Sequence, residues 1–373
     1  MVAVVVGRSD APDDGRIVAQ PNTVTPMLLE LTDDQRAIQE VFGAFFRREC
    51  PTTVVRVAEP LGFDAALWAR LADLGAPAMG LPEAAGGGGA SLADLAVVAD
   101  AAGRAIAPAP FVDHAVAGRL LARLDALDDG VLDGTTVATL AVRPAVAGAP
   151  VWSLAPSGAV ASVVVGLVGA DLVCVRGDGP GTAPRNHGSM PVADRSTAAG
   201  TVLATGAAAA AAFAVALAEW RTLTAAALTG IARSAQDIAI RYVNERHQFD
   251  RPIGAFQALQ QQLADLPIVI DGAFLLASKA AWAGDRGTAG IIDVGLCDIT
   301  DFETLAAMAF IFAGEAAAHA TDRSLHAHGG YGYAEEYDIQ LFFRRARGWT
   351  LVAGDPSKEC LALSDRLYGP VGS

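Results

Sequence analysis

The chain has 373 residues, 52% of them hydrophobic and 6% aromatic, and carries a formal net charge of −14 at pH 7. This length is enough to bury a large core and suggests about two or three structural units. An acidic surface repels the phosphate backbone of nucleic acids and anionic lipid headgroups, so we expect neither a nucleic-acid nor a membrane partner. The composition therefore predicts a soluble, cytoplasmic protein in which local arginines hold any phosphate-bearing cofactor.

The segment 27–125 is expected to form an N-terminal helical domain. Its first helix is indicated by Thr32 as N-cap and by apolar side chains that recur on one helical face, at Ile38, Phe42, Phe45 and Phe46. Similar patterns follow at residues 63–77 and, after a glycine-rich loop, at residues 90–108.

The segments 126–204 and 205–373 differ clearly in their residue patterns. In the first, short β-branched runs are separated by Gly, Pro and Asp, which predicts a small antiparallel β domain. In the second, the pattern is helical again, with breaks at 250–254, 283–290 and 328–333. Its longest apolar run is too short to span a bilayer. The sequence therefore predicts an α+β chain that is mainly α.

No metal site is expected, because the four cysteines are scattered without the spacing of metal ligands. Two other motifs point to an anionic ligand. Pro252 ends a helix and leaves Arg246 near its end, where a planar guanidinium can grip a pyrophosphate by paired hydrogen bonds. Further on, Gly329 and Gly330 remove side chains so that backbone can approach a ligand, and a following helix would aim its N–H groups at an anion.

Three stretches together resemble the acyl-CoA dehydrogenase family. They are "LWARLADLGAPAMGLPEAAGGGGASLADLAVVADAAGRAIAPAP", "RHQFDRPIGAFQALQQQLAD" and "HGGYGYAEEY". The likeness covers roughly residues 28 to 370 and implies two helical domains around a small β-barrel, reduced here, with the last domain a four-helix bundle. It also implies FAD as cofactor and an acyl-CoA thioester as substrate. It makes Met27 a natural start, so that residues 1–26 are expected to be a flexible extension.

The resemblance assigns cofactor-binding roles residue by residue. In the family, one subunit holds the flavin ring while its neighbour in the dimer grips the ADP half. The matching positions for that grip are Arg246, Gln248, Phe249, Gln257, Gly329 and Gly330, with His326 where the family usually has Gln. The alternative for His326 is an ordinary histidine at a helix end.

The chain departs from the family at the flavin ring and at the catalytic base. The ring-binding stretch resembling T-E-P-x-x-G-S-D has no match; the nearest candidate is "LAPSGAVAS". A carboxylate must remove the substrate α-proton, but the two family positions for it carry Ala353 and Trp220. Glu219 is one residue away from the second position and Asp355 two residues after the first. No catalytic residue is therefore assigned to this chain.

Three interpretations follow. In the first, the chain resembles the cofactor-poor subunit of bacterial heterotetrameric acyl-CoA dehydrogenases that act on steroid side chains. A second dehydrogenase subunit then shares FAD with it in an α2β2 assembly and supplies the ring pocket and the catalytic Glu. In the second, the chain is a self-sufficient homotetramer that uses Glu219 or Asp355. In the third, it is a flavin-free scaffold or regulatory subunit.

Overall fold

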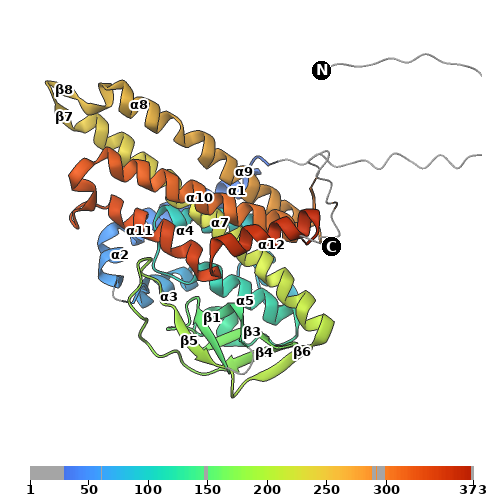
Figure 1. Cartoon of the computed structure of the whole chain (residues 1–373). Helices are drawn as coiled ribbons and strands as arrows, with labels where there is room; N and C mark the ends of the chain where they lie inside the picture. The colour runs from blue at the N-terminus through green and yellow to red at the C-terminus, as the bar shows by residue number, and fades with distance from the viewer. Residues whose placement is uncertain (1–28, 60, 147–149, 288–290, 292–298, 371–373) are drawn as a thin grey trace, which may run out of the picture.

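The computed structural model describes residues 29–59, 61–146, 150–287, 291 and 299–370. The predicted extension at 1–26 lies outside the described residues. Figure 1 shows the strands β1–β6 gathered at one end of the molecule and long helices running away from them toward the opposite end. The expected order of a helical region, a central β region and a second helical region is confirmed.

Helices precede the strands, as expected. They are α1 (Asp33–Glu49), α2 (Thr52–Ala58), α3 (Ala65–Asp73), η1 (Glu83–Ala85), α4 (Leu92–Arg104), α5 (Phe111–Arg123) and α6 (Asp129–Asp133). The predicted N-cap of α1 is confirmed, since the Thr32 hydroxyl accepts from the Gln35 backbone N–H and the Gln35 side chain accepts from the Thr32 backbone N–H. The predicted apolar face is buried at Phe42, Phe45 and Phe46.

The middle region consists of two sheets rather than one antiparallel unit. Its strands are β1 (Ala138–Ala145), β2 (Val151–Ala155), β3 (Val163–Val168), β4 (Asp171–Arg176), β5 (Ala193–Ser196) and β6 (Thr201–Thr205). One sheet has the order β1-β3-β4-β6 and the other pairs β2 with β5. The prediction of a purely antiparallel unit was wrong, because β1 and β3 are parallel. Strand β2 lies between β1 and β3 in the sequence, but it pairs with β5 in the other sheet. This connection lets the chain return to the same end of the first sheet, so that β3 runs parallel to β1.

The last region is a bundle around two long helices. Its elements are α7 (Gly206–Glu245), β7 (His247–Gln248), β8 (Arg251–Pro252), η2 (Ile253–Ala255), α8 (Gln257–Ala264), α9 (Leu266–Asp285), α10 (Phe302–Ala327), η3 (Gly329–Tyr333), α11 (Ile339–Thr350), η4 (Leu351–Ala353) and α12 (Pro356–Tyr368). Helices α7 and α10 pack against each other, and each of them also packs against α9 and α11. The β7–β8 hairpin and α8 lie at the end of the molecule remote from β1–β6 (Figure 1).

Helix α7 joins the two helical regions by packing closely on α4. Gly103 of α4 and Gly230 of α7 make this approach possible, because a Cβ at either position would collide with the backbone of the other helix, at Ala227 or Asp100. The two helices therefore form one rigid crossing at the centre of the molecule.

By length and composition alone, three helical stretches could cross a membrane: Gly206–Glu245, Gln257–Asp285 and Phe302–Ala327. The sequence-based expectation considered only the shorter apolar run at the start of α7 and missed this. In the first and third stretches, 67% of the most apolar window is buried inside the fold. Their apolar character is therefore largely used for packing within the bundle.

Candidate functional site

A strained hairpin forms one side of the candidate site. Arg246 is the C-cap of α7 and leaves the helix with ψ 122°. Strands β7 and β8 then pair, and their turn residues Phe249 and Asp250 both have positive φ, 56° and 60°. Such values at both central positions are those of a type I′ turn, which favours Asn and Gly. The turn holds the Phe249 ring out of the fold, 85% exposed.

The predicted arginine lies beside the predicted glycine segment. The Arg246 guanidinium carbon is 5.4 Å from the centre of the Tyr331 ring in η3. Within the described part of the chain, Arg246 forms no ion pair. Its N–H groups are therefore available to an anion from outside.

The ends of α7 and α10 are locked together behind this arginine. The Tyr242 and His328 rings stack with centres 4.1 Å apart, and the Tyr242 hydroxyl donates to the His328 carbonyl at 3.5 Å. Burial lowers the pKa of His328, so the ring is neutral and structural. The predicted His326 differs, since it is exposed and its Nδ1 donates to the Asp322 carbonyl at 2.9 Å.

The two predicted glycines face open space. Gly329 adopts φ 60°, which explains glycine there from the backbone alone. Gly330 has no such constraint, and no atom of the described chain lies within 4 Å of a Cβ placed on either residue. No contact within the described chain therefore requires glycine at position 330, as expected where a ligand approaches the backbone.

All of the predicted cofactor residues are exposed: Arg246, Gln248, Phe249, Gln257, His326, Gly329 and Gly330. The end of α7 supplies Arg246, the hairpin supplies Gln248 and Phe249, and the start of α8 supplies Gln257. The end of α10 supplies His326, and η3 supplies Gly329 and Gly330. Tyr331 and the Tyr242–His328 stack place Arg246 beside the glycines. We call this set the clamp.

Trp220, the residue expected at the family's second base position, has a structural role. Trp220 is buried in α7, and its Nε1 donates to Asp113 Oδ1 at 2.9 Å. The other oxygen of Asp113 accepts from the Ser157 hydroxyl at 2.5 Å. Burial raises the pKa of Asp113, while these two hydrogen bonds lower it. Asp113, Ser157 and Trp220 thus connect α5, α7 and the loop that follows β2. The sequence-based prediction missed Asp113 because it stands in no motif.

Glu219 is not placed to act as a base. It is 3% exposed and lies 3.0 Å from Arg119 Nε. Arg123 adds two parallel hydrogen bonds to its carboxylate, at 2.7 and 2.9 Å. Two guanidinium groups thus bind both oxygens of the carboxylate between α5 and α7.

Asp355 also has a structural role. Its carboxylate accepts from the Ser357 N–H at 2.9 Å and caps α12. Ala353, the residue expected at the family's other base position, ends η4 two residues before Asp355 and carries only a methyl group.

A cavity of only about 90 Å³ lies beside Trp220. Its wall includes Asp113, Ser157, Trp220 and Trp349. Ligand pockets generally enclose about 300–1,000 Å³. The stretch proposed as nearest to the family's ring-binding strand, residues 154–162, contributes a tight turn here, with positive φ at Leu154 and Ser157. This part of the chain offers no room for a tricyclic ring.

The two helical regions match families of known proteins. Residues 32–124 match the family described as "Acyl-CoA dehydrogenase, N-terminal domain", and residues 210–367 match "Acyl-CoA dehydrogenase, C-terminal domain". The two matches lie on either side of the strands β1–β6 and cover most of the chain.

Individual relatives are similar over nearly their whole length. The chain is 29% identical over 344 residues to acyl-CoA dehydrogenase IpdE2 of Mycolicibacterium smegmatis, covering 91% of this chain and 100% of that protein. It is 29% identical over 390 residues to benzylmalonyl-CoA dehydrogenase of Aromatoleum aromaticum, covering 89% and 97%. A solved structure of a variant of the Tcur3481–Tcur3483 steroid ACAD contains a chain that is 27% identical, with a TM-score of 0.77 and coverage of 89% and 97%.

Proposed function

This chain belongs to the acyl-CoA dehydrogenase family, and from that premise we propose that it is the cofactor-clamping subunit of a heteromeric dehydrogenase. In this proposal its clamp holds the ADP half of FAD at a subunit interface. A second acyl-CoA dehydrogenase subunit supplies the pocket for the flavin ring and the carboxylate that removes the substrate α-proton.

The observation that carries the proposal is the contrast between two parts of the same chain. The clamp residues are exposed, and Arg246 has no ion-pair partner within the described residues. By contrast, both base positions hold side chains that cannot take a proton, and the neighbouring cavity is only about 90 Å³. A subunit that is only a scaffold would not need the clamp. A self-sufficient enzyme would need a catalytic base and a pocket for the flavin ring as well.

The residues of the clamp fit the ADP half of FAD. Arg246 can donate two parallel hydrogen bonds to a diphosphate, which is the geometry that a guanidinium favours. Gly330 lets backbone approach the ligand without a side chain in between. Phe249 offers an exposed ring to the adenosine.

The residues around the small cavity do not fit the flavin ring. Asp113 and Trp220 of its wall are hydrogen-bonded to each other, and the Trp349 side chain forms a further part of the wall. When bound, FAD accepts a hydride from the acyl group. This chain's contribution to that reaction is to retain and orient the cofactor from the far end.

The relatives support a proposal for the substrate and the assembly. The structure that contains a chain of 27% identity is described as the Tcur3481–Tcur3483 steroid ACAD. We extend this to the present chain, and propose a steroid side-chain acyl-CoA as substrate and an α2β2 heterotetramer in the cytoplasm.

Co-expression tests the proposal. Purified alone, the chain is expected to be colourless. Purified with its partner subunit, it is expected to form a yellow complex whose intact mass, measured by native mass spectrometry, corresponds to one FAD per heterodimer. A chain that is yellow and active alone would overturn the proposal in favour of a homotetramer. A stable complex without flavin would instead support a scaffold.

A further inference from the structure

The hairpin carries a second arginine that has no role in the site described above. Arg251 begins β8, is exposed, and pairs with Gln248 of β7. Residues paired across two antiparallel strands point to the same face, and so do residues two positions apart in one strand. Arg246 leaves α7 with an extended backbone two positions before Gln248. Arg246, Gln248 and Arg251 therefore share one face of the hairpin.

Both arginines of this face are held by an aromatic ring. The Arg251 guanidinium carbon lies 4.2 Å from the centre of the Phe256 ring. That of Arg246 lies 5.4 Å from the centre of the Tyr331 ring. A ring under the face of a guanidinium restrains the side chain and leaves the N–H groups at its edge available. Both arginines therefore present their donors from a restrained position.

Arg251 also lies among residues of the clamp. The Phe256 ring on which it stacks belongs to the residue directly before Gln257. The Phe249 and Phe256 rings meet edge to face, with centres 6.0 Å apart. Arg251 is thus joined through one ring to the tip of the hairpin and to the start of α8.

No carboxylate neutralises Arg251 within the described part of the chain. Its guanidinium forms no ion pair and no hydrogen bond there, and its one resolved contact is the stack on Phe256. The acids nearest in sequence are Glu245 and Asp250, and both are exposed without an ion pair to it. In a chain with a net charge of −14, an arginine without an acidic partner is available to an anion from outside.

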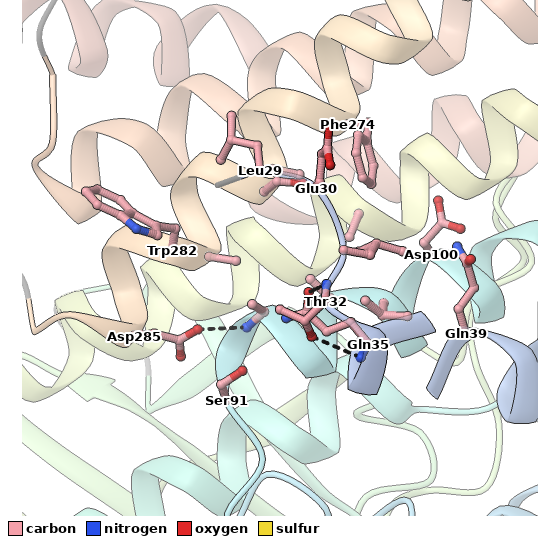
Figure 2. Close-up of a pocket in the computed structure, with 18 of the residues that line it drawn as sticks. Leu29, Glu30, Thr32, Gln35, Gln39, Ser91, Asp100, Phe274, Trp282 and Asp285 are labelled. Carbon is pink, nitrogen blue, oxygen red and sulfur yellow. Dashed lines mark hydrogen bonds between the residues drawn. The ribbon is translucent and has the colours of Figure 1, made fainter. Parts of the chain in front are cut away.

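Other stacked arginines of the chain provide a comparison. Arg233 lies over Phe274, 5.0 Å from the ring centre, and also lies 3.4 Å from Asp271. Arg286 lies over Trp282, 4.7 Å from the ring centre. Figure 2 shows both rings in the wall of a cavity of about 540 Å³. A stacked arginine alone therefore does not indicate a ligand site. The hairpin differs because two guanidiniums without an ion pair among the described residues share one of its faces.

We infer that Arg251 is a second anion-binding residue of the clamp, and that Arg246 and Arg251 take one phosphate each of a nucleoside diphosphate. The inference rests on the proposed function, in which the clamp holds the ADP half of FAD. From the spacing of strands and residues in a sheet, the two Cα atoms are about 8 Å apart, so two long side chains on one face can converge on neighbouring phosphates. A monophosphate engages one guanidinium fewer, so the clamp favours FAD over a mononucleotide such as FMN.

Titration of the full chain with ADP and with AMP tests the inference without flavin. Ligand-observed NMR is expected to show that the parent binds ADP about tenfold or more tightly than AMP, because a second charge-assisted contact is made. Arg251→Ala and Arg246→Ala are each expected to reduce this preference to about twofold or less. Arg286→Ala is the matched control, an exposed arginine over a ring, separated from α8 by about 30 Å of helix α9. It is expected to keep the preference of the parent.

A second measurement uses the complex with the partner subunit. After dialysis, the Arg251→Ala complex is expected to retain less FAD than the Arg286→Ala complex. Arg251→Lys keeps the charge but not the planar fork, and is expected to retain an intermediate amount. Loss of ADP affinity in Arg246→Ala but not in Arg251→Ala would overturn the inference and leave the proposed function standing. If neither substitution weakened binding of ADP or FAD, both would fail. An equal loss in Arg286→Ala would assign the effect to overall charge and also overturn the inference.

Discussion

Trp220 donates a hydrogen bond from its indole Nε1 to Asp113 Oδ1 at 2.9 Å. The two residues are 107 positions apart in the chain, and with Ser157 they connect both helical regions to the loop after β2. Trp220, which the sequence leads us to expect at a base position of part of the family, thus has a role in the internal structure.

The strength of this connection can be measured by a double-mutant cycle of Trp220→Phe and Asp113→Ala. Because a hydrogen bond to a carboxylate contributes more than a neutral one, we expect a coupling free energy of about 1–2 kcal/mol in urea unfolding. The cycle of Trp349→Phe with Asp113→Ala is the control, since both side chains line the small cavity. A coupling in the control as large as in the test pair would show that cavity packing, not the hydrogen bond, is responsible.

Glu219→Gln separates stability from turnover. The substitution leaves Arg119 and Arg123 without their shared negative partner, so we expect a loss of about 3 kcal/mol in the free energy of unfolding. If the proton-removing carboxylate belongs to a partner subunit, as proposed, turnover per folded complex should stay within about twofold. A loss of activity of about 100-fold at normal folding would restore Glu219 as the base.

Asp355→Asn is the matched test of the other candidate base. Asn caps a helix about as well as Asp, so both the melting temperature and the turnover of the complex are expected to stay close to the parent values. A large fall in turnover alone would identify Asp355 as the catalytic base and contradict the proposed division of roles.

Arg246→Ala is expected to lower the affinity of the complex for FAD. The diphosphate loses a charge-assisted hydrogen-bonded pair contributing about 1.5–3 kcal/mol, which corresponds to roughly 10- to 100-fold in Kd. The readout is flavin absorbance per complex after extensive dialysis. Arg241→Ala, also an exposed arginine in the last turns of α7, is the control. Equal flavin content in both variants would contradict the clamp.

Gly330→Ala tests the clamp without disturbing the chain itself. A Cβ at this residue meets no atom of the described chain within 4 Å, so we expect the stability of the isolated chain to change by less than about 0.5 kcal/mol. Flavin content of the complex should fall, because the methyl group occupies the space left for the ligand. Unchanged flavin content would show that the bare surface at Gly330 serves another purpose.

His114 predicts a pH dependence of stability. Its ring is buried, with Nε2 donating to the Val131 carbonyl at 3.0 Å and Nδ1 accepting from the Ala138 N–H at 3.2 Å. Burial lowers the pKa of His114 from the usual 6.5 to about 4. The unfolded chain therefore binds a proton at a higher pH than the folded chain does.

The His114 contribution is fully present above about pH 6.5 and is lost as the pH falls toward 4, with a total of about 3 kcal/mol. Urea unfolding at a series of pH values between these limits measures it. His114→Gln is expected to be less stable at pH 7 but to show a smaller slope in this window. Identical slopes for parent and variant would assign the acid sensitivity to other groups.

Much of the fold could be predicted because its signals are local. Thr32 and Gln35 are three positions apart, and a capping box forms between neighbours whatever the rest of the chain does. The end of a helix near Arg246 was likewise expected from the nearby Pro252, whereas the hairpin that follows was not. The absence of a carboxylate at Ala353 and Trp220 is likewise a property of single positions.

Other features depend on where distant segments meet. Glu219 looks like a candidate base until Arg119 and Arg123, about a hundred residues earlier, are found on its carboxylate. Asp113 belongs to no motif and gains its importance only from Trp220 and Ser157. The parallel pairing of β1 with β3 depends on β2 leaving the sheet for β5. Periodicity and capping act between residues one to four positions apart and are written into the sequence. A buried charge needs a partner because it has been removed from water, but this need does not specify which residue the partner is. The packing of whole helices decides that.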